Sequence, residues 1–274
     1  TFVDVVDMFE VPYENYSNYV SIKLDNGYIQ NFSEQHKCQT YRDYETKIIE
    51  SQNLKVGDSF LISAKPWGID NEIGNYKSGK ILGYYLAEGW KGTHSKSEIC
   101  FAINMDREDI VKDVKKFFTE WGCDITVKRE EDKKIFKIKV FGNQAVGFVE
   151  RFVSGNRATE KRLLSKLWNT CDDFRNGVYD GYYETDGCPN HNIFAHTTNK
   201  KLAKDLIILA SSVGHILKYR ENPNNTRYFK EDKSDKVKFT SYELKVMDSF
   251  YSKYNDFYIV PIEKVELIKS NTNI

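Results

Sequence analysis

The chain has 274 residues, enough for one large or two medium domains, and 40% of them are hydrophobic, so it is globular rather than disordered. No apolar run approaches the ~18 residues that cross a bilayer as a helix. The formal net charge is zero, but the charges are unevenly distributed: residues 1–75 hold 12 acidic and 6 basic side chains, and residues 76–218 hold 24 basic and 19 acidic ones. Overall neutrality therefore does not exclude a nucleic-acid partner.

The five cysteines are widely scattered, and no pair has the CxxC spacing of a zinc site. We interpret them as reduced thiols rather than a disulfide framework. The chain does not open with a basic and then apolar signal segment. We therefore expect an intracellular protein, in the cytoplasm or nucleoid, with no membrane partner.

Residues 19–58 contain a predicted strand pair, the block Ser-Glu-Gln-His at 33–36 and the run Leu-Lys-Val-Gly-Asp at 54–58. This segment resembles the Hint domain, the splicing domain of inteins. The resemblance places Ser33 and His36 at the Thr and His positions of the T-x-x-H block, as a splicing-block remnant. Residues 257–265 resemble the return of the chain into that domain. We expect residues 1–63 and the return strand at 257–274 to form one mostly β, Hint-like segment.

Two parts of the splicing chemistry are missing from the pattern. Thr1 stands where the first block would begin with cysteine or serine, and Ile274 stands where the last block would end in His-Asn. We therefore expect that this chain does not splice by itself. Three alternatives stay open: the larger fragment of a split intein, with a complementary intein fragment as its partner, a trimmed form of a longer chain, or a free-standing endonuclease with a Hint remnant.

After a predicted linker at 64–78, the chain contains an internal repeat. Residues 79–89 read Gly-Lys-Ile-Leu-Gly-Tyr-Tyr-Leu-Ala-Glu-Gly, and residues 177–187 read Gly-Val-Tyr-Asp-Gly-Tyr-Tyr-Glu-Thr-Asp-Gly. Predicted helices over 106–121 and 199–213 follow, each ending in a glycine that suits a left-handed C-cap, and strand-like runs come next at 124–129 and 215–220. The pattern predicts a pseudo-twofold domain over 79–256, with repeat one at 79–165 and repeat two at 177–256.

The repeated helix carries a ridge of small residues. Gly79, Gly83 and Ala87 recur every four residues, and the second copy has its own ridge at the matching positions. Such ridges let two helices pack backbone against backbone, which compensates the ~1 kcal/mol that each helical glycine costs. Each ridge ends in an acid, Glu88 or Asp186, at the helix end where the macrodipole disfavours negative charge. A divalent cation would relieve both this conflict and the repulsion between the two acids.

Residues 81–89 and 179–187 resemble the two LAGLIDADG (dodecapeptide) motifs of single-chain homing endonucleases of the intein-encoded type, over about residues 76–258. The resemblance implies an α+β fold in which a duplicated pseudo-twofold αββαββα endonuclease domain accompanies the Hint-like segment. It implies that Mg²⁺ or Mn²⁺ is held by the two motif ends. The residues assigned to this metal site are Glu88, Asp186, Gly89 and Gly187.

The resemblance also implies catalytic lysines. Residues 155–163 resemble the block ahead of the second motif, which places Lys161 as the active-site lysine. Lys253 lies 39 residues past Gly214, as Lys161 lies 39 past Gly122, and is assigned to the second site, although Lys245 is an alternative.

Strand-like runs with alternating lysines are predicted to form the DNA-reading surface, because alternation places the lysines on one face and the apolar residues on the other. Either repeat contains such a run, at 137–140 and at 236–239. The full candidate DNA-binding set is Arg129, Lys134, Lys137, Lys139, Arg220, Arg227, Lys230, Lys236 and Lys238.

The expected function is site-specific cleavage of both strands of double-stranded DNA at a long target site, leaving 3′ overhangs, by a monomeric metal-dependent hydrolase. The alternative from a different class is a non-cleaving DNA- or RNA-binding module that kept the fold.

Overall fold

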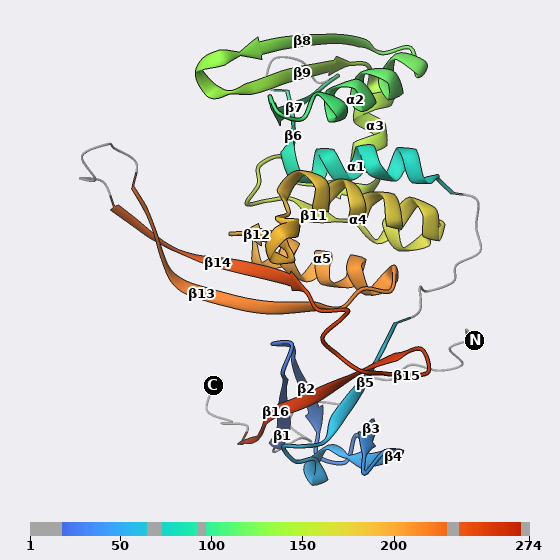
Figure 1. Ribbon diagram of the computed structural model, residues 1–274, viewed down its shortest axis with the longest axis vertical. Coiled ribbons are helices and arrows are strands. Elements are labelled where there is room, and N and C mark those ends of the chain that lie inside the picture. The colour runs from blue at the N-terminus through green and yellow to red at the C-terminus, as the bar shows by residue number, and fades with distance from the viewer. Residues whose placement is uncertain (1–17, 65–72, 93–96, 229–235, 270–274) are drawn as a thin grey trace. The chain divides into compact units, whose positions relative to one another are not determined.

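The computed structural model describes residues 18–64, 73–92, 97–228 and 236–269 (Figure 1). The fold is mixed α+β. The chain forms two compact units, of which one combines residues 1–62 with residues 251–274 and the other spans residues 63–250. No helix of the described part is long and apolar enough to cross a membrane.

The smaller unit is a seven-stranded sheet to which both ends of the chain contribute. Its path runs in the order β2-β1-β16-β5-β3-β4, and β15 pairs with β16. The strands are β1 (Asn18–Leu24), β2 (Ile29–Ser33), β3 (Lys37–Arg42), β4 (Glu45–Glu50), β5 (Ser59–Ser63), β15 (Lys253–Tyr254) and β16 (Phe257–Lys269). Alternation in β1 buries Val20, Ile22 and Leu24 on one face. Antiparallel pairing of β1 with β16 from Asn18↔Lys269 onward joins the two chain ends.

A buried ion pair ties three parts of the smaller unit together. Asp58 is 1% exposed, and both of its carboxylate oxygens accept hydrogen bonds of 2.5 Å from the guanidinium of Arg42 on β3. The backbone N–H of Lys55 also donates to this carboxylate at 2.9 Å, and the carbonyl oxygen of Asp58 accepts from Ile262 of β16. Burial alone would raise the pKa of Asp58, but these hydrogen bonds outweigh it and hold the pKa below its ordinary value.

In the larger unit, repeat one runs α1 (Tyr76–Glu88), β6 (Gly89–Lys91), β7 (Glu98–Asn104), α2 (Glu108–Glu120), β8 (Asp124–Glu130), β9 (Ile135–Phe141) and α3 (Asn143–Phe152). This is the αββαββα order. Repeat two runs α4 (Asp172–Asp186), β12 (Ile193–Thr197), α5 (Lys200–Ser212), β13 (Leu217–Tyr228) and β14 (Lys236–Val246). Between the repeats lie the short strands β10 (Val153–Ser154) and β11 (Arg162–Leu163).

The two repeats differ from the expected identical pair. In the described part of repeat two, a single strand precedes α5, because residues 189–191 form a 3₁₀ turn. After β14, the chain continues to β15 of the smaller unit rather than to a closing helix. The first sheet has the order β6-β7-β9-β8, and the second has the order β12-β14-β13. Within the larger unit, Figure 1 shows α1 and α4 side by side between the β8–β9 hairpin and the β13–β14 hairpin.

The boundary of α1 departs from the expected linker. The helix begins at Tyr76 rather than at Gly79, because Asn75 and Ser78 form a capping box. The Asn75 side chain accepts from the Ser78 N–H at 2.9 Å, and the Ser78 hydroxyl is 3.2 Å from the Asn75 N–H. The predicted glycine C-caps at the ends of α2 and α5 are confirmed, since Gly122 and Gly214 have φ of 71° and 87°.

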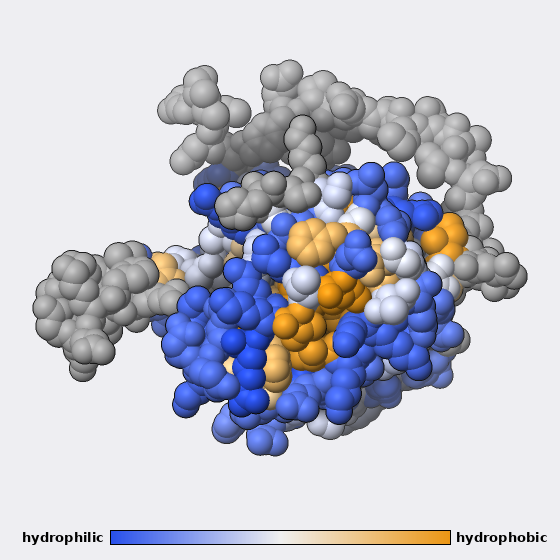
Figure 2. Space-filling model, turned by 90° about the horizontal axis from the view of Figure 1, so that it is seen from above, coloured by the Kyte–Doolittle hydropathy of each residue, from blue (hydrophilic) through white to orange (hydrophobic). Residues whose placement is uncertain are grey.

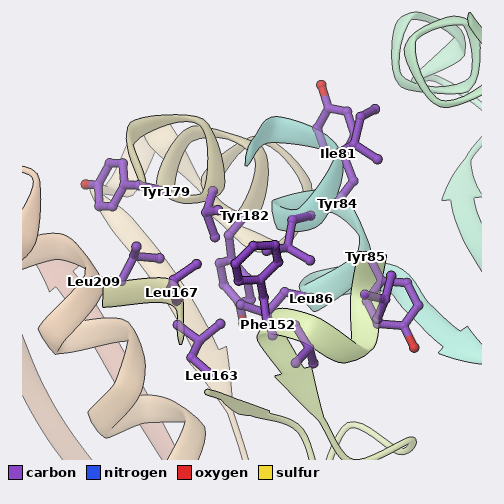
Figure 3. Packing of buried hydrophobic residues seen from close by; sticks show 14 of the residues in the cluster. Ile81, Tyr84, Tyr85, Leu86, Phe152, Leu163, Leu167, Tyr179, Tyr182 and Leu209 are labelled. Atoms are coloured by element: carbon purple, nitrogen blue, oxygen red, sulfur yellow. The ribbon is translucent and has the colours of Figure 1, made fainter. Parts of the chain in front are cut away.

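One hydrophobic core spans both repeats (Figure 3). Tyr85 of α1 meets Phe101 of β7 edge-on, with ring centroids 5.8 Å apart, and Tyr179 of α4 stacks on Phe194 of β12 at 4.5 Å. Figure 2 shows a mostly hydrophilic surface that encloses an apolar patch. Among the exposed apolar side chains of repeat one are Trp121 and Val127, both 41% exposed.

Replacing Arg42 with alanine should lower the free energy of unfolding of the smaller unit by ~3–5 kcal/mol, because it leaves the buried Asp58 carboxylate without its partner. Since the folded pKa of Asp58 is depressed, this stabilisation is present above the ordinary aspartate pKa of about 4 and is lost as the pH falls below it. Denaturant unfolding at neutral and acidic pH measures both effects. Lys47→Ala removes an exposed ion pair with Asp43 and should change stability by less than about 1 kcal/mol; an equal loss in the two variants would contradict the assignment.

Candidate active site

The site is built on the contact between α1 and α4. A Cβ atom placed on Gly83 would lie 2.5 Å from the carbonyl oxygen of Val178 and 2.7 Å from the backbone nitrogen of Tyr182. Gly79 faces the Phe174 backbone, and Gly177 and Gly181 face the α1 backbone with as little room. The predicted backbone-to-backbone packing of the two ridges is therefore confirmed.

This packing brings the two motif acids to the same end of the helix pair. Glu88 is the last residue of α1 and Asp186 the last residue of α4. Both following glycines are extended rather than left-handed. Gly89 is required for space, because a Cβ there would lie 2.7 Å from the carbonyl oxygen of Tyr85. A Cβ on Gly187 would lie still closer to the carbonyl oxygen of Tyr183.

The electrostatics of the acids show an unneutralised site. Burial and, next, the charge of Asp186 raise the pKa of Glu88, while Lys161 partly offsets them. Burial also raises the pKa of Asp186, against opposing effects of the Tyr182 hydroxyl, His196 and Lys161. Two half-buried carboxylates that face one cationic side chain favour a further positive charge, and carboxylate oxygens are hard ligands that suit Mg²⁺ or Mn²⁺. The described residues hold no cluster of three or more acid, His or Cys side chains that could bind a metal ion.

Lys161 lies at the foot of the helix pair but does not point into solvent. Its side chain is 2% exposed, and Nζ donates to the carbonyl oxygens of Tyr85 at 3.0 Å and Leu86 at 2.8 Å. It thereby caps the carboxyl end of α1. Burial lowers the pKa of Lys161 to about 8, although Glu88 and Asp186 act to raise it. The segment is fixed by Asn199, whose side chain donates to the Lys161 carbonyl at 2.8 Å.

The two candidates for the second lysine lie on different strands. Lys253 belongs to the smaller unit, on β15, where its Nζ lies 4.5 Å from the centre of the Tyr258 ring. The alternative, Lys245, is exposed on β14 opposite Ile193. What the structure places at Asp186 is the Tyr182 hydroxyl, which donates at 2.7 Å, and the backbone N–H of His196. The constant spacing between the two repeats does not identify His196 as a neighbour of Asp186. A bulge between Ile193 and Ala195 changes the register of β12 relative to the first repeat.

A second group missed from the sequence is Glu184, which occupies the position of Leu86 in the other repeat. Its carboxylate pairs with Lys80 at 2.8 Å and accepts from the Tyr84 hydroxyl at 3.1 Å, so an ionic contact crosses the helix pair. Arg107 donates to the Glu184 carbonyl and so caps the end of α4, as Lys161 caps α1. The signal in the sequence was an acid at the position where the first repeat has the apolar Leu86.

The sheets place the candidate DNA-binding side chains on different faces. In the first sheet, Ile138 and Val140 enter the core, and Lys137 and Lys139 lie on the opposite side, here called the open face. Arg129 pairs with Phe136 and therefore lies on the core side rather than with these lysines. Lys134 lies in the β8–β9 turn with φ of 54°.

In the second sheet, Leu244 and Tyr242 mark the core side. Arg220 pairs with Glu243 on the open face. Lys238 falls on the same side of β14 as Tyr242 and Leu244, contrary to the expectation that the alternating lysines face DNA. Lys230 lies outside the described residues, as do the side chains of Arg227 and Lys236.

The splicing-block candidates lie in the smaller unit. Ser33 ends β2, and its carbonyl oxygen accepts from the Ser51 hydroxyl at 2.6 Å and from the His36 N–H at 3.0 Å. The exposed His36 ring stacks on Phe32 with centroids 4.7 Å apart. The two residues thus form a turn.

Comparison with known proteins gives distant similarities. No family model matches the chain. Over 188 residues it is 25% identical to transcription initiation factor IIB of Methanocaldococcus jannaschii, covering 68% of this chain and 25% of that protein. Over 196 residues it is 26% identical to the replication factor C small subunit of the same organism, covering 69% of this chain and 10% of that protein. The chain thus matches only a tenth to a quarter of the length of these relatives.

Among solved structures, mesophilic variants of the homing endonuclease I-DmoI are 12% identical, with a TM-score of 0.40 and coverage of 62% of this chain and 88% of that one. I-DmoI in complex with DNA and Mn is 13% identical, with the same TM-score and coverage of 62% and 89%.

Replacing Gly83 with alanine should destabilise the larger unit and separate the two acids, because the new methyl group meets α4 backbone that cannot move aside independently. We expect a loss of ~1–3 kcal/mol in the free energy of unfolding. Gly147→Ala in α3 is the matched control, since its Cβ would have no atom within 4 Å and should stabilise the helix by ~1 kcal/mol. Denaturant unfolding of both variants measures the difference, and a stabilised Gly83→Ala would contradict the close packing.

Proposed function

We propose that the larger unit is a site-specific, metal-dependent endonuclease that cuts both strands of a long DNA duplex. The observation that carries the proposal is the pair of half-buried acids, Glu88 and Asp186, at the common foot of two helices packed backbone to backbone. A binding module has no need for two carboxylates that repel each other and disfavour phosphate. The pseudo-twofold repeat matches the twofold symmetry of duplex DNA, so that each acid-bearing helix end serves one strand.

Glu88 and Asp186 would hold the divalent cation, with the backbone at Gly89 and Gly187 next to it. A bound cation supplies Lewis acidity toward the phosphate and an activated water at neutral pH. Lys161 favours the ionised form of Glu88, and its bonds to the Tyr85 and Leu86 carbonyls fix the end of α1 that carries this acid. The Tyr182 hydroxyl and the His196 N–H orient Asp186. Cuts displaced across the minor groove would leave 3′ overhangs.

We infer further that the chain is a homing endonuclease of the intein-encoded type. Two observations support this. Both chain ends build one sheet in the smaller unit, as the Hint resemblance implies. In addition, similar segments of 188 and 196 residues occur in two proteins with different names, of which they form only a part, as expected for a module independent of its host. A complementary intein fragment remains a prediction from the sequence.

Asp186→Asn and the double variant Glu88→Gln/Asp186→Asn should cut a randomised duplex library in Mg²⁺ at least ~10³-fold more slowly than the unchanged protein, because loss of a metal ligand removes several kcal/mol of transition-state stabilisation. Target affinity should be nearly unchanged. Asp180→Asn, on the same helix away from its end, should cut normally. Undiminished cutting by Asp186→Asn would exclude it as a ligand, and selective retention of duplexes without cutting by the unchanged protein would favour a binding module.

A further inference from the structure

A hydrogen-bonded row of side chains crosses all three strands of the second sheet. Ser241 on the central strand β14 is 1% exposed, and its hydroxyl lies 3.2 Å from Nε2 of His196 on β12. The side-chain amide of Asn225 on β13 donates to the same hydroxyl from the other side. Ser241 is therefore hidden beneath the two side chains that it holds in place.

The register of β13 places Asn225 on the open face. Asn222 pairs with Ser241, but Asn225 pairs with Phe239, so one extra residue is inserted on β13 between them. Pro223 falls in this bulge, where a residue without an N–H does not interrupt the ladder. Without the extra residue, Asn225 would face the core side.

The first sheet carries a different chemistry on its open face. The corresponding cross-strand row pairs Trp90 with Cys100, Cys100 with Lys139, and Lys139 with Thr126. Lys139 forms an ion pair of 2.9 Å with the buried Glu98, and the Nζ of Lys137 lies 5.9 Å from the centre of the Trp90 ring. A lysine ammonium is a point charge that suits phosphate.

An asparagine amide offers a donor and an acceptor side by side, and an imidazole offers two ring nitrogens, so both match the edges of bases rather than phosphates. Fixing such groups through a buried hydroxyl lowers the entropy lost on binding. The row lies next to the candidate active site, because the backbone N–H of His196 donates to the Asp186 carboxylate. Bases contacted by the row would therefore lie next to the cut made on the Asp186 side.

We propose that the two repeats read DNA unequally: the His196–Ser241–Asn225 row makes the second repeat the main reader of base sequence, and the lysines of the first repeat mainly bind the phosphate backbone. This inference rests on the proposed function, since it assumes duplex DNA on the open faces. His196 and Asn225 are specificity-determining residues, and Ser241 is a positioning residue that acts through them.

The test is selection of bound duplexes from a pool with a randomised target, without divalent metal, followed by sequencing. The unchanged protein should select a site in which one half carries more base information. Asn225→Ala should relax the preference at one or two base pairs of that richer half by roughly 10- to 100-fold, and Ser241→Ala should relax the same positions without contacting them. His196→Gln keeps a polar side chain and should alter the preference at a neighbouring position. Thermal unfolding of each variant checks that the larger unit remains folded.

Lys137→Ala is the matched control. It should weaken binding to all sequences alike and reduce the slope of log affinity against log salt by about 1. Equal information in the two halves, or an Asn225→Ala variant that behaves like Lys137→Ala, would overturn the inference.

Cleavage of the same pool in Mg²⁺ tests the proposed function separately. Cutting at a site with equally informative halves would overturn the inference alone. Unequal selection without cutting would overturn the nuclease and leave the inference standing, and enrichment of no duplex would overturn both.

Discussion

The close contact of α1 with α4 is the constraint on which the larger unit depends. Glycines at 79, 83, 177 and 181 leave no room for a Cβ, so the two backbones touch. The contact sets how the two helices lie against each other, and hence brings together their last residues, Glu88 and Asp186. It also half-buries the two acids, which is what raises their pKa values and makes a cation favourable there. Packing and chemistry thus have one cause, and the helical glycines, costly in isolation, are explained by it.

The same contact is not symmetric in its chemistry. Lys80 of α1 pairs with Glu184 of α4 across the helices. The residue equivalent to Lys80 in the second repeat is Val178, and the residue equivalent to Glu184 in the first repeat is Leu86, so this pair has no counterpart. One side of the helix pair is therefore ionic and the other apolar, a pattern that favours pairing of unlike repeats over pairing of two identical ones. Arg107 and Lys161 repeat the asymmetry, since different elements supply the cations that cap α4 and α1.

Features governed by local spacing could be predicted from the sequence: the repeat, the glycine ridges, the converging acids and the glycine C-caps. The pairing of both chain ends in one sheet was expected only from the resemblance to the Hint domain. What could not be predicted was which side of a sheet a residue faces. Arg129 and Lys238 lie on the core side of their sheets because hairpin register decides the face, and a shift of one residue reverses it. The bulges in β12 and β13 likewise set the positions of His196 and Asn225. Burial of Lys161 was equally hidden, because its partners are backbone carbonyls that have no signature in the sequence.

The two acids have overlapping but unequal sets of neighbours. Glu88 has a cation nearby, Lys161, which acts against the burial that raises its pKa. The same lysine acts on Asp186, where the Tyr182 hydroxyl and His196 also oppose the burial that raises its pKa. The tyrosine equivalent to Tyr182 in repeat one is Tyr84, and it binds Glu184 rather than Glu88. Lys161 is therefore shared by the two acids, whereas Tyr182 and His196 act on Asp186. In a duplicated site of this kind, the position of the acid at the foot of the helix pair is the repeated element, and the groups that tune it are free to diverge.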